Sequence, residues 1–381
     1  MLNHNKIIDC CTELNYDFKN IDLLKQALTR TSVHNERSNS FLDYNKIFNR
    51  RLEFLGDAVL RCIISDSLIE QYPSRREGFL SEERDKLVSI DRLNTIAKKL
   101  NLDQFVSAGQ GERNLLNSNT KILPEVIKTV IGAIFIDCDR DYSRISKFIN
   151  GHFNILSLSH ISEQKPYDFG IHQYKDFFKQ LKYTFKDKGL FEKALTHASA
   201  SNENGKPNNE VLEFLGDGVL RCVISDLLME KHSKYDISQL NPERDKLVSN
   251  EINSMLHHIA EMLNLNEFIS FGKGEVLNKV GRSRALINAM EALIGAIFID
   301  CGRDYSCISK FIDGHFNISR PLVIAESSVT QISPEGPRMI PIYNNQQRQT
   351  KCSWITSGIA AAAGIAVAII LPLYYLQKPK L

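Results

Sequence analysis

The sequence lacks features that would place it in several common classes of protein. Its eight cysteines include no CxxC pair, which argues against a zinc site or a dithiol redox motif and favours buried thiols in a reducing compartment. The formal net charge is only +2, so binding to a polyanion would have to come from a local basic patch. The first residues contain no apolar core of the kind found in secretory signals, and alternating strand patterns are scarce throughout the chain.

What the chain does contain is a long internal repeat. The segment RLEFLGDAVL at 51–60 recurs as VLEFLGDGVL at 211–220, and IGAIFIDC at 131–138 recurs unchanged at 294–301. Further matching blocks keep the same order in both halves, which excludes chance similarity between amphipathic helices. In both copies the apolar residues recur every three or four positions, as on helices. We therefore expect an all-α protein in which one helical domain is duplicated.

Changes in composition predict the boundaries of these domains. Residues 320–353 are rich in Pro, Ser, Gln and Asn, as linkers are. The predicted parts are domain 1 at 1–155, a linker at 156–181, domain 2 at 182–320, a flexible linker at 321–353 and a transmembrane helix at 354–376.

The last of these parts is predicted from a long uncharged segment. Residues 355–376 contain no charged side chain and are long enough to cross a bilayer as a helix. Lysines lie on both sides, and Trp354, Tyr374 and Tyr375 stand where interfacial aromatics are common. We expect a single-pass C-terminal anchor with the repeats on the cytoplasmic face of a membrane. The alternative is a soluble, alanine-rich helix.

Each copy of the LEFLGD segment places two acids inside an apolar helix. Glu53 and Asp57 in the first copy, and Glu213 and Asp217 in the second, are spaced i,i+4. Residues at this spacing lie on one face of a helix. Because buried acids must be paired, protonated or bound to a metal, these two pairs are candidates for chemistry.

A second polar pair follows later in each repeat. Glu125 and Lys128 in repeat 1, and Asn288 and Glu291 in repeat 2, are spaced i,i+3 on a predicted helix. Packed against the LEFLGD helix, such a face would complete a cluster rich in oxygen atoms. Hard oxygen ligands of this kind suit Mg²⁺ or Mn²⁺.

On these segments the chain resembles the ribonuclease III family. The resemblance rests on RRLEFLGDAVL, on YPSRREGFLSEERDKLVS at 72–89, and on a GxGE loop followed by EALIGAIFID. It covers about residues 15–155 and 182–318. It implies an all-α endonuclease fold whose domains pair, so the two repeats would form an intramolecular pseudo-dimer. It also implies metal-dependent cleavage of double-stranded RNA, with each domain supplying one centre for one strand.

The resemblance assigns repeat 2 a nearly complete centre. Glu213, Asp217 and Glu291 match the family's catalytic acids and metal ligands, whereas Asn288 stands where the family usually has Asp. The amide oxygen of Asn288 can still ligate Mg²⁺. We therefore expect metal binding that is weaker but not abolished.

The centre of repeat 1 departs further from the family. Glu53 and Asp57 match, and Glu125 is a longer carboxylate in the Asp position, but Lys128 replaces the final Glu. At about 4 Å and an effective dielectric of about 20, the ammonium group would repel a cation by roughly 4 kcal/mol per unit charge. Lys128 would instead pair with one of the three acids. We therefore predict that repeat 1 is the degenerate, structural half.

Other family positions have also diverged, and differently in each repeat. The glutamate that often precedes the signature helix is Glu210 in repeat 2 but Arg50 in repeat 1. The acid of the EGFLS segment is Glu77 in repeat 1, and repeat 2 offers only Asp236. His197, in the ALTHAS block, is interpreted as a packed or helix-capping residue and not as a ligand.

We expect no double-stranded-RNA-binding domain of the kind common in the family, because residues 320–353 show no alternating strand pattern. RNA contacts would then come from the paired nuclease surface. Basic residues near the predicted centres could contact phosphates or could simply be solvated surface charge. These candidates are Arg75, Arg76, Arg113, Lys273, Lys279, Arg282 and Arg284.

The leading hypothesis is a membrane-anchored, divalent-metal-dependent endoribonuclease that acts in RNA processing. It would cut double-stranded RNA at one competent centre, in repeat 2, and would therefore nick one strand. The alternative is a membrane-anchored pseudonuclease that binds structured RNA without cleaving it. A third hypothesis is a purely structural dimerisation module. Whether two chains also associate is left open.

Overall fold

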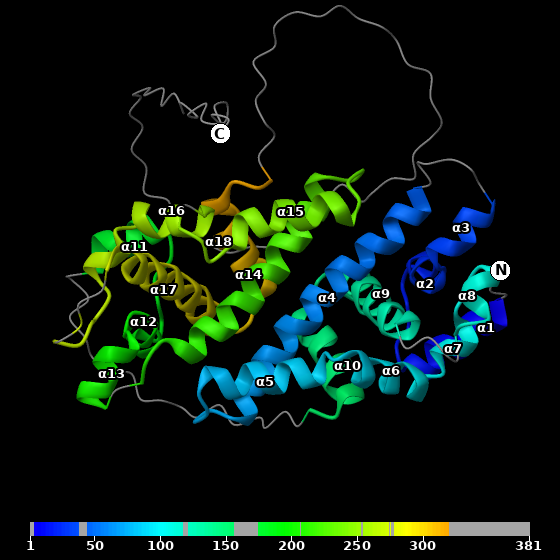
Figure 1. Ribbon diagram of the computed structural model, residues 1–381, viewed down its shortest axis with the longest axis horizontal. Coiled ribbons are helices and arrows are strands. Elements are labelled where there is room, and N and C mark those ends of the chain that lie inside the picture. Colours follow the sequence, from blue (N-terminus) through cyan, green and yellow to red (C-terminus); the bar gives the residue numbers. More distant parts are fainter. Residues whose placement is uncertain are drawn as a thin grey trace, which may run out of the picture. The chain divides into compact units, whose positions relative to one another are not determined.

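The computed structural model describes residues 4–37, 44–116, 121–155, 174–205, 207–252, 254–273, 275 and 278–319. Within these ranges the expected all-α architecture is confirmed (Figure 1). Outside the helices, bridge pairing among the described residues is limited to Thr29 with Ser107 and Thr196 with Ser270. The two bridges occupy equivalent places in the two repeats, so even this detail is duplicated.

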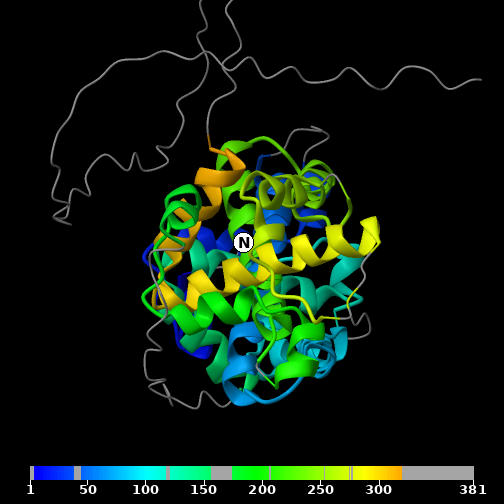
Figure 2. The ribbon, with the colours of Figure 1, turned by 90° about the vertical axis from the view of Figure 1, so that its left-hand side faces the viewer.

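The helices occur in the same order in both repeats. The first repeat contains α1 (His4–Leu14), α2 (Ile21–Leu28), α3 (Thr31–Arg37), α4 (Tyr44–Gln71), α5 (Glu77–Leu87), α6 (Ile90–Lys99), α7 (Leu102–Phe105), α8 (Gln110–Arg113), α9 (Ile122–Asp137) and α10 (Tyr142–Phe153). The second contains α11 (Lys175–Leu181), α12 (Lys188–Ala194), α13 (Ala198–Asn204), α14 (Glu210–Lys231), α15 (Ile237–Val248), α16 (Met255–Met262), the 3-10 turn η2 (Leu265–Glu267), α17 (Lys279–Asp300) and α18 (Tyr305–Phe316). In Figure 2 the second repeat faces the viewer, with α17 in yellow.

Each repeat is built around two long helices that cross at glycines. A Cβ atom at Gly56 on α4 would lie 1.8 Å from the carbonyl oxygen of Lys128 on α9. Likewise, a Cβ atom at Gly216 on α14 would lie 1.8 Å from the carbonyl oxygen of Glu291 on α17. Only glycine permits backbones to approach so closely. The glycine of LEFLGD therefore brings the acids on one helix beside the polar pair on the other.

The two repeats pack together through α4 and α14, and both belong to one compact unit. Equivalent ion pairs cross between the repeats on either side of this contact. Arg140 Nε lies 2.5 Å from Asp226 Oδ2, and Arg303 Nε lies 2.7 Å from Asp66 Oδ2. The expected intramolecular pseudo-dimer is therefore confirmed, with a pseudo-twofold axis between α4 and α14.

One predicted linker contains a helix. Residues 175–181, at the end of the predicted linker 156–181, form α11, which is the counterpart of α1. Phe177, Phe178 and Leu181 on α11 are buried against the second repeat. The helix was missed because its short apolar run follows a polar stretch. The second domain therefore begins before residue 182.

The membrane prediction concerns a part of the chain that is not described. Among the helices that the structure does describe, none is both long and apolar enough to cross a membrane. The segment 355–376 and the predicted linker at 321–353 lie outside the described residues.

Candidate active site

Four of the predicted site residues meet where α14 and α17 cross. Glu213 and Asp217 lie one turn apart on α14, and Asn288 and Glu291 lie on the facing part of α17. We call these four residues the second centre. Glu291 is only 1% exposed, and its Oε1 atom is buried without a hydrogen-bond partner. The Asn288 side chain is close enough to Glu213 to work against the rise in its pKa.

Negative charge in the second centre is poorly compensated. Burial, followed by the charges of Glu77, Glu210 and Asp217, raises the pKa of Glu213 to about 7. Burial, followed by the charges of Asp217 and Glu213, raises the pKa of Glu291 well above its usual range. Acids that resist ionisation in this way would be stabilised in their charged form by a cation. The second centre is therefore an electrostatic environment that favours binding of a cation.

The first repeat contributes an acid to the second centre. Glu77 starts α5, and residues 74–79 together with Glu210 line a cleft of about 620 Å³. The charge of Glu77 acts on Glu213 across the repeat boundary. The sequence does not predict this position of Glu77, because it does not show how the two repeats pair.

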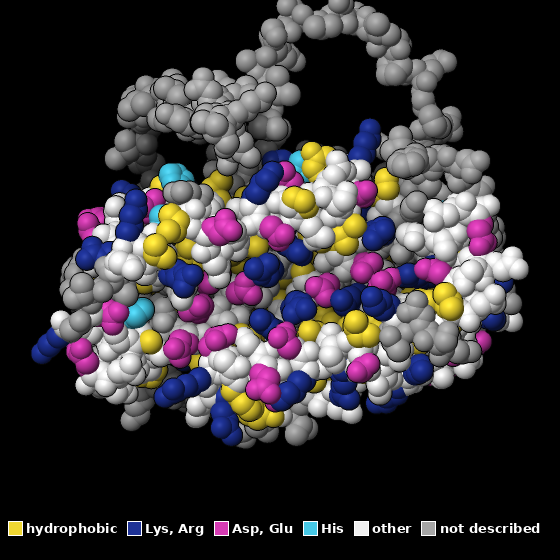
Figure 3. Space-filling view, viewed as in Figure 1, with side chains coloured by type: hydrophobic (Ala, Val, Ile, Leu, Met, Phe, Trp, Pro, Cys, Tyr) yellow, Lys and Arg dark blue, Asp and Glu magenta, His cyan; other side chains and the backbone are white. Residues whose placement is uncertain are grey.

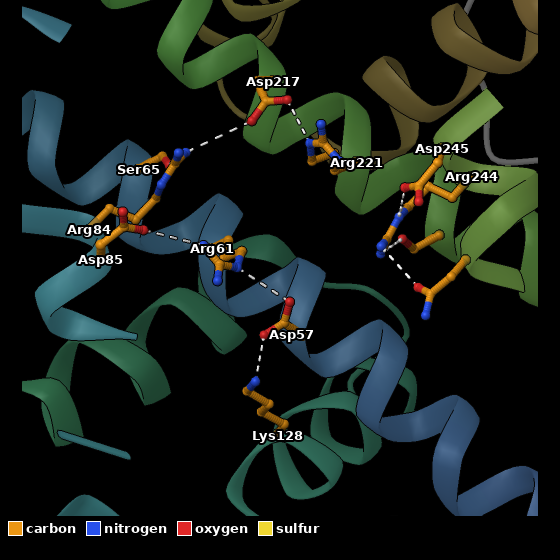
Figure 4. A network of polar contacts seen from close by, with 12 residues as sticks. Asp57, Arg61, Ser65, Arg84, Asp85, Lys128, Asp217, Arg221, Arg244 and Asp245 are labelled. Carbon is orange, nitrogen blue, oxygen red and sulfur yellow. Dashed lines mark hydrogen bonds and ion pairs between the residues drawn. The ribbon is translucent and has the colours of Figure 1, made fainter. Parts of the chain in front are cut away.

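In the first repeat, basic side chains occupy the equivalent place. We call Glu53, Asp57, Glu125 and Lys128 the first centre. Lys128 Nζ lies 2.8 Å from Asp57 Oδ1, as Figure 4 shows. Burial alone would raise the pKa of Asp57, but Lys128 and then Arg61 lower it below its usual value. The expected ion pair between Lys128 and an acid of this centre is present.

A second cation neutralises the other acids of the first centre. Arg30, which is 7% exposed, places its Nη2 atom 2.7 Å from Glu125 Oε2 and 3.1 Å from Glu112 Oε1. Burial and Glu125 raise the pKa of Glu53, and Lys128 and Arg30 work against that rise. Every acid of the first centre therefore lies close to a built-in cation.

The residues beside the two centres also make the second centre more negatively charged than the first. The second centre has two acids there, Glu77 and Glu210, and both raise the pKa of Glu213. At the equivalent place the first centre has Asp236 and Arg50. The pKa of Asp236 is lowered chiefly by hydrogen bonds from Ser238, with a smaller contribution from Arg50. Thus only the second centre carries like charges at this position.

The residues of the second centre lie near one another, but their oxygen atoms do not converge on a single cation position. In the described ranges, no group of three or more His, Cys, Asp or Glu side chains is arranged to hold a metal ion. Asp217 instead pairs with Arg221, whose Nε lies 2.7 Å from Oδ1, and Arg84 Nη1 lies 4.0 Å from Oδ2. The donor set still fits a divalent cation, because it offers carboxylate and amide oxygens, one of them buried and unpartnered.

Comparison with known proteins shows the family to which both repeats are similar. A family model described as Ribonuclease-III-like matches residues 20–153 and 187–314. The chain belongs to the ribonuclease-III-like family. Ribonuclease 3 of Borreliella burgdorferi is 42% identical over 143 residues, which are 37% of this chain and 56% of that relative. Ribonuclease 3 of Shewanella sp. (strain ANA-3) is 42% identical over 135 residues, which are 35% of this chain and 55% of that relative.

The ribonuclease-III-like chain also has a solved structural neighbour that spans both repeats. The structure of Giardia Dicer matches with a TM-score of 0.50 and 15% sequence identity, over 71% of this chain and 55% of that chain. At this identity the likeness concerns the fold alone, and it supports two tandem helical domains. The matches with the curated relatives span little more than half of each relative's length. The predicted family resemblance is confirmed.

His197 has the structural role that the sequence predicted. It caps α13, and its Nδ1 atom accepts a hydrogen bond of 3.2 Å from the backbone N–H of Ser199. In this ribonuclease-III-like chain, the basic residues beside the centres were recognised only in part. Arg75 and Arg76 line the cleft beside Glu77, as expected of candidate phosphate contacts.

A group of arginines near Asp57 and Asp217 was not predicted from the sequence. These are Arg61, Arg84, Arg221 and Arg244. A signal for them was available, because two of them follow the signature aspartates at i,i+4 and the other two recur in the repeated ERDKLVS segment.

Proposed function

We propose that this ribonuclease-III-like chain is a divalent-metal-dependent endoribonuclease that hydrolyses phosphodiester bonds in double-stranded RNA. Its competent centre is the second one. The observation that supports this proposal is the contrast in charge between the centres. Glu213 and Glu291 have raised pKa values and lack a cation partner comparable to Lys128, which lies 2.8 Å from Asp57 in the first centre.

The side chains of the second centre have distinct roles in this proposal. Glu213, Asp217 and Glu291 hold Mg²⁺ or Mn²⁺ together with the amide oxygen of Asn288. A bound divalent cation supplies charge that activates water and neutralises the phosphodiester. Glu291 can ionise fully only when positive charge is present, because it is almost completely buried. Binding of a cation would therefore displace protons from Glu213 and Glu291.

A chain with one competent centre should nick its substrate. The first centre keeps the shape of its partner, but Lys128 and Arg30 already neutralise its acids. Arg75 and Arg76, exposed beside the cleft at Glu77, are suited to contact phosphates of the strand that enters the second centre. We expect one strand of a duplex to be cut per binding event, as a step in RNA processing.

The test compares matched variants of the two centres. The full chain is incubated with Mg²⁺ and duplex RNA carrying a different label on each strand. Glu291→Gln should slow cleavage by at least about 100-fold, because it removes a metal ligand. Glu125→Gln, the control in the first centre, should cut at nearly the wild-type rate. Equal cutting by Glu291→Gln and wild type contradicts the assignment of the second centre.

One observation favours a second candidate function, a pseudonuclease that binds structured RNA without cleaving it. Asp217 is already paired with Arg221 at 2.7 Å, and Asn288 contributes no charge. If this pair outcompetes a cation, duplex RNA binds but is never cut. A titration with Mg²⁺ and then Mn²⁺ separates the two functions, since a pseudonuclease shows no cleavage at any concentration of either ion.

We also propose that residues 355–376 anchor the chain, with both repeats on the cytoplasmic face of a membrane. The support is the uncharged length of this segment, flanked by lysines and aromatic residues. Deletion of 355–376 should move the protein from the membrane fraction to the supernatant after alkaline extraction. An intact chain that already stays in the supernatant contradicts the anchor and favours the soluble helix.

A further inference from the structure

A polar pocket lies between the two centres, where the repeats meet. Its volume is about 290 Å³, and its lining consists of equivalent residues from both repeats. These are Asp57 with Asp217, Ala58 with Gly218, Arg61 with Arg221, and Arg84 with Arg244. Figure 3 shows basic and acidic side chains interleaved across the middle of this face, and Figure 4 shows the network around the pocket. We call it the dyad pocket.

Two of the four arginines are held rigidly by the opposite repeat. The guanidinium carbon of Arg84 lies 4.5 Å from the centre of the Phe214 ring, and that of Arg244 lies 4.6 Å from the centre of the Phe54 ring. Arg84 Nη1 also donates to Ser65 Oγ at 3.1 Å. Their side chains are only 15% and 17% exposed. Cation–π contacts and burial therefore orient both guanidinium groups before any ligand arrives.

Positive charge in the dyad pocket exceeds negative charge. Four guanidinium groups face two carboxylates, and one of these, Asp57, is also paired with Lys128. The Nε atoms of Arg84 and Arg244 are buried without a hydrogen-bond partner. An anion in the pocket would therefore compensate part of the charge of these two buried arginines.

Outside the lining, Glu291 acts on Arg221 and Glu77 acts on Arg84, whereas two further acids are largely exposed. Asp85 Oδ1 lies 3.6 Å from Arg61 Nη1, and Asp245 Oδ1 lies 3.7 Å from Arg244 Nε. Their side chains are 71% and 64% exposed, so water screens both carboxylates.

We propose that the dyad pocket binds one phosphoryl oxyanion. Guanidinium groups match the oxygen geometry of phosphate, and four of them converge here on a space that admits a small anion. The phosphoryl group belongs either to free phosphate or pyrophosphate or to the backbone of a bound RNA. Only the second source rests on the proposed function.

The proposal is tested by equilibrium dialysis of the full chain against radiolabelled inorganic phosphate, at constant ionic strength and without divalent metal. The wild type should bind one phosphate per chain. The double variant R84Q/R244Q should bind at least about tenfold more weakly, because it loses charge-assisted hydrogen bonds. The control K98Q/K99Q removes the same charge from exposed positions on α6 and should bind as the wild type does.

A second double variant guards against misfolding of the first. Arg61 and Arg221 are 38% and 36% exposed, so R61Q/R221Q should fold even if R84Q/R244Q does not, and it should also lose affinity. Thermal unfolding without phosphate shows which variants are folded. The proposal is overturned if the wild type binds no phosphate, if folded pocket variants bind as tightly as the wild type, or if K98Q/K99Q loses as much affinity.

Competition identifies the source of the phosphoryl group. Duplex RNA is added without divalent metal, so that no cleavage occurs. Displacement of labelled phosphate in proportion to bound RNA shows that the pocket takes a backbone phosphate, whereas simultaneous binding shows that it takes the free anion. Because neither readout depends on hydrolysis, a failure of the proposed nuclease activity leaves the result on the pocket intact.

Discussion

Lys128 and Glu291 occupy the same position in the two repeats and have opposite effects on the acids around them. Lys128 lowers the pKa of Asp57 by direct pairing at 2.8 Å. Glu291 adds a buried negative charge beside Glu213 and Asp217, and its own pKa is raised. Lys128, together with Arg30, thus gives the first centre its own cations, whereas the second centre has an acid at the position of Lys128.

At the residue scale, Lys128→Ala should destabilise the metal-free protein. It leaves Asp57, whose side chain is 29% exposed, without its closest partner, and the free energy of unfolding should fall by about 1–3 kcal/mol. Urea unfolding at pH 7 measures the change. Lys98→Ala, at an exposed site on α6, is the control and should stay within about 0.5 kcal/mol. If both variants unfold alike, Lys128 does not neutralise the first centre.

The raised pKa of Glu213 predicts a pH dependence of cation binding. With a pKa of about 7 in the metal-free protein, Glu213 carries a proton below that pH, and a cation must displace it. Affinity for Mn²⁺ should therefore rise as the pH passes through 7, by up to about tenfold per pH unit. Titrations at pH 6 and pH 8 measure this, and Glu213→Gln should reduce the dependence to the part due to Glu291. A wild-type affinity that does not change with pH argues against the shift.

The raised pKa of Glu213 also affects the stability of the metal-free fold, which should fall as the pH rises, whereas cation affinity should increase. A carboxyl whose folded-state pKa is raised stabilises the fold below its usual value of 4.5 and loses that contribution as the pH rises through about 7. The second centre is therefore held at a cost in stability that a cation would offset.

At the scale of elements, the glycine crossings position both centres. The α14–α17 crossing depends on Gly216 facing the backbone of α17, and on Gly295, where a Cβ atom would lie 2.2 Å from the carbonyl oxygen of Leu212. The crossing places Glu213 and Asp217 opposite residues 288–291. Any separation of the two helices would therefore also separate the acids of the second centre.

Gly216→Ala should be severely destabilising. The added methyl group would lie 1.8 Å from the carbonyl oxygen of Glu291, and backbone atoms cannot yield as a flexible side chain can. We expect a loss of at least about 3 kcal/mol in the free energy of unfolding. Gly314→Ala on α18 is the matched control, because nothing lies within 4 Å of its added Cβ, and it should gain up to about 1 kcal/mol. Similar effects at the two sites would contradict the crossing.

The helices and the family were predictable from the sequence, because the duplicated LEFLGD segment shows both its period and its acids. The short helix α11 was not predicted, since its few apolar residues stabilise it only by packing on the second repeat. The position of Glu77 beside Glu213 also escaped prediction, because it depends on how the repeats pair. Arg61 was visible at i,i+4 from Asp57, yet its place in a shared pocket emerges only from the pairing.

At the scale of the whole molecule, two domains with similar folds pair, but the charges of their centres differ. Ion pairs such as Arg140–Asp226 and Arg303–Asp66 repeat on both sides of the interface, so the scaffold stays close to twofold symmetric. The charges at the centres do not follow this symmetry. Both repeats therefore contribute to the fold, and we expect only the second to bind a cation.

Titration of the full chain with Mn²⁺, followed by the electron paramagnetic resonance signal of the free ion, tests this central claim most directly. We predict that the wild type and Glu125→Gln bind Mn²⁺ with similar affinity, because the first centre already contains its own cations. Glu291→Gln should bind it at least about tenfold more weakly. If Glu125→Gln loses the ion and Glu291→Gln retains it, or if both bind like the wild type, the assignment of the two centres is wrong.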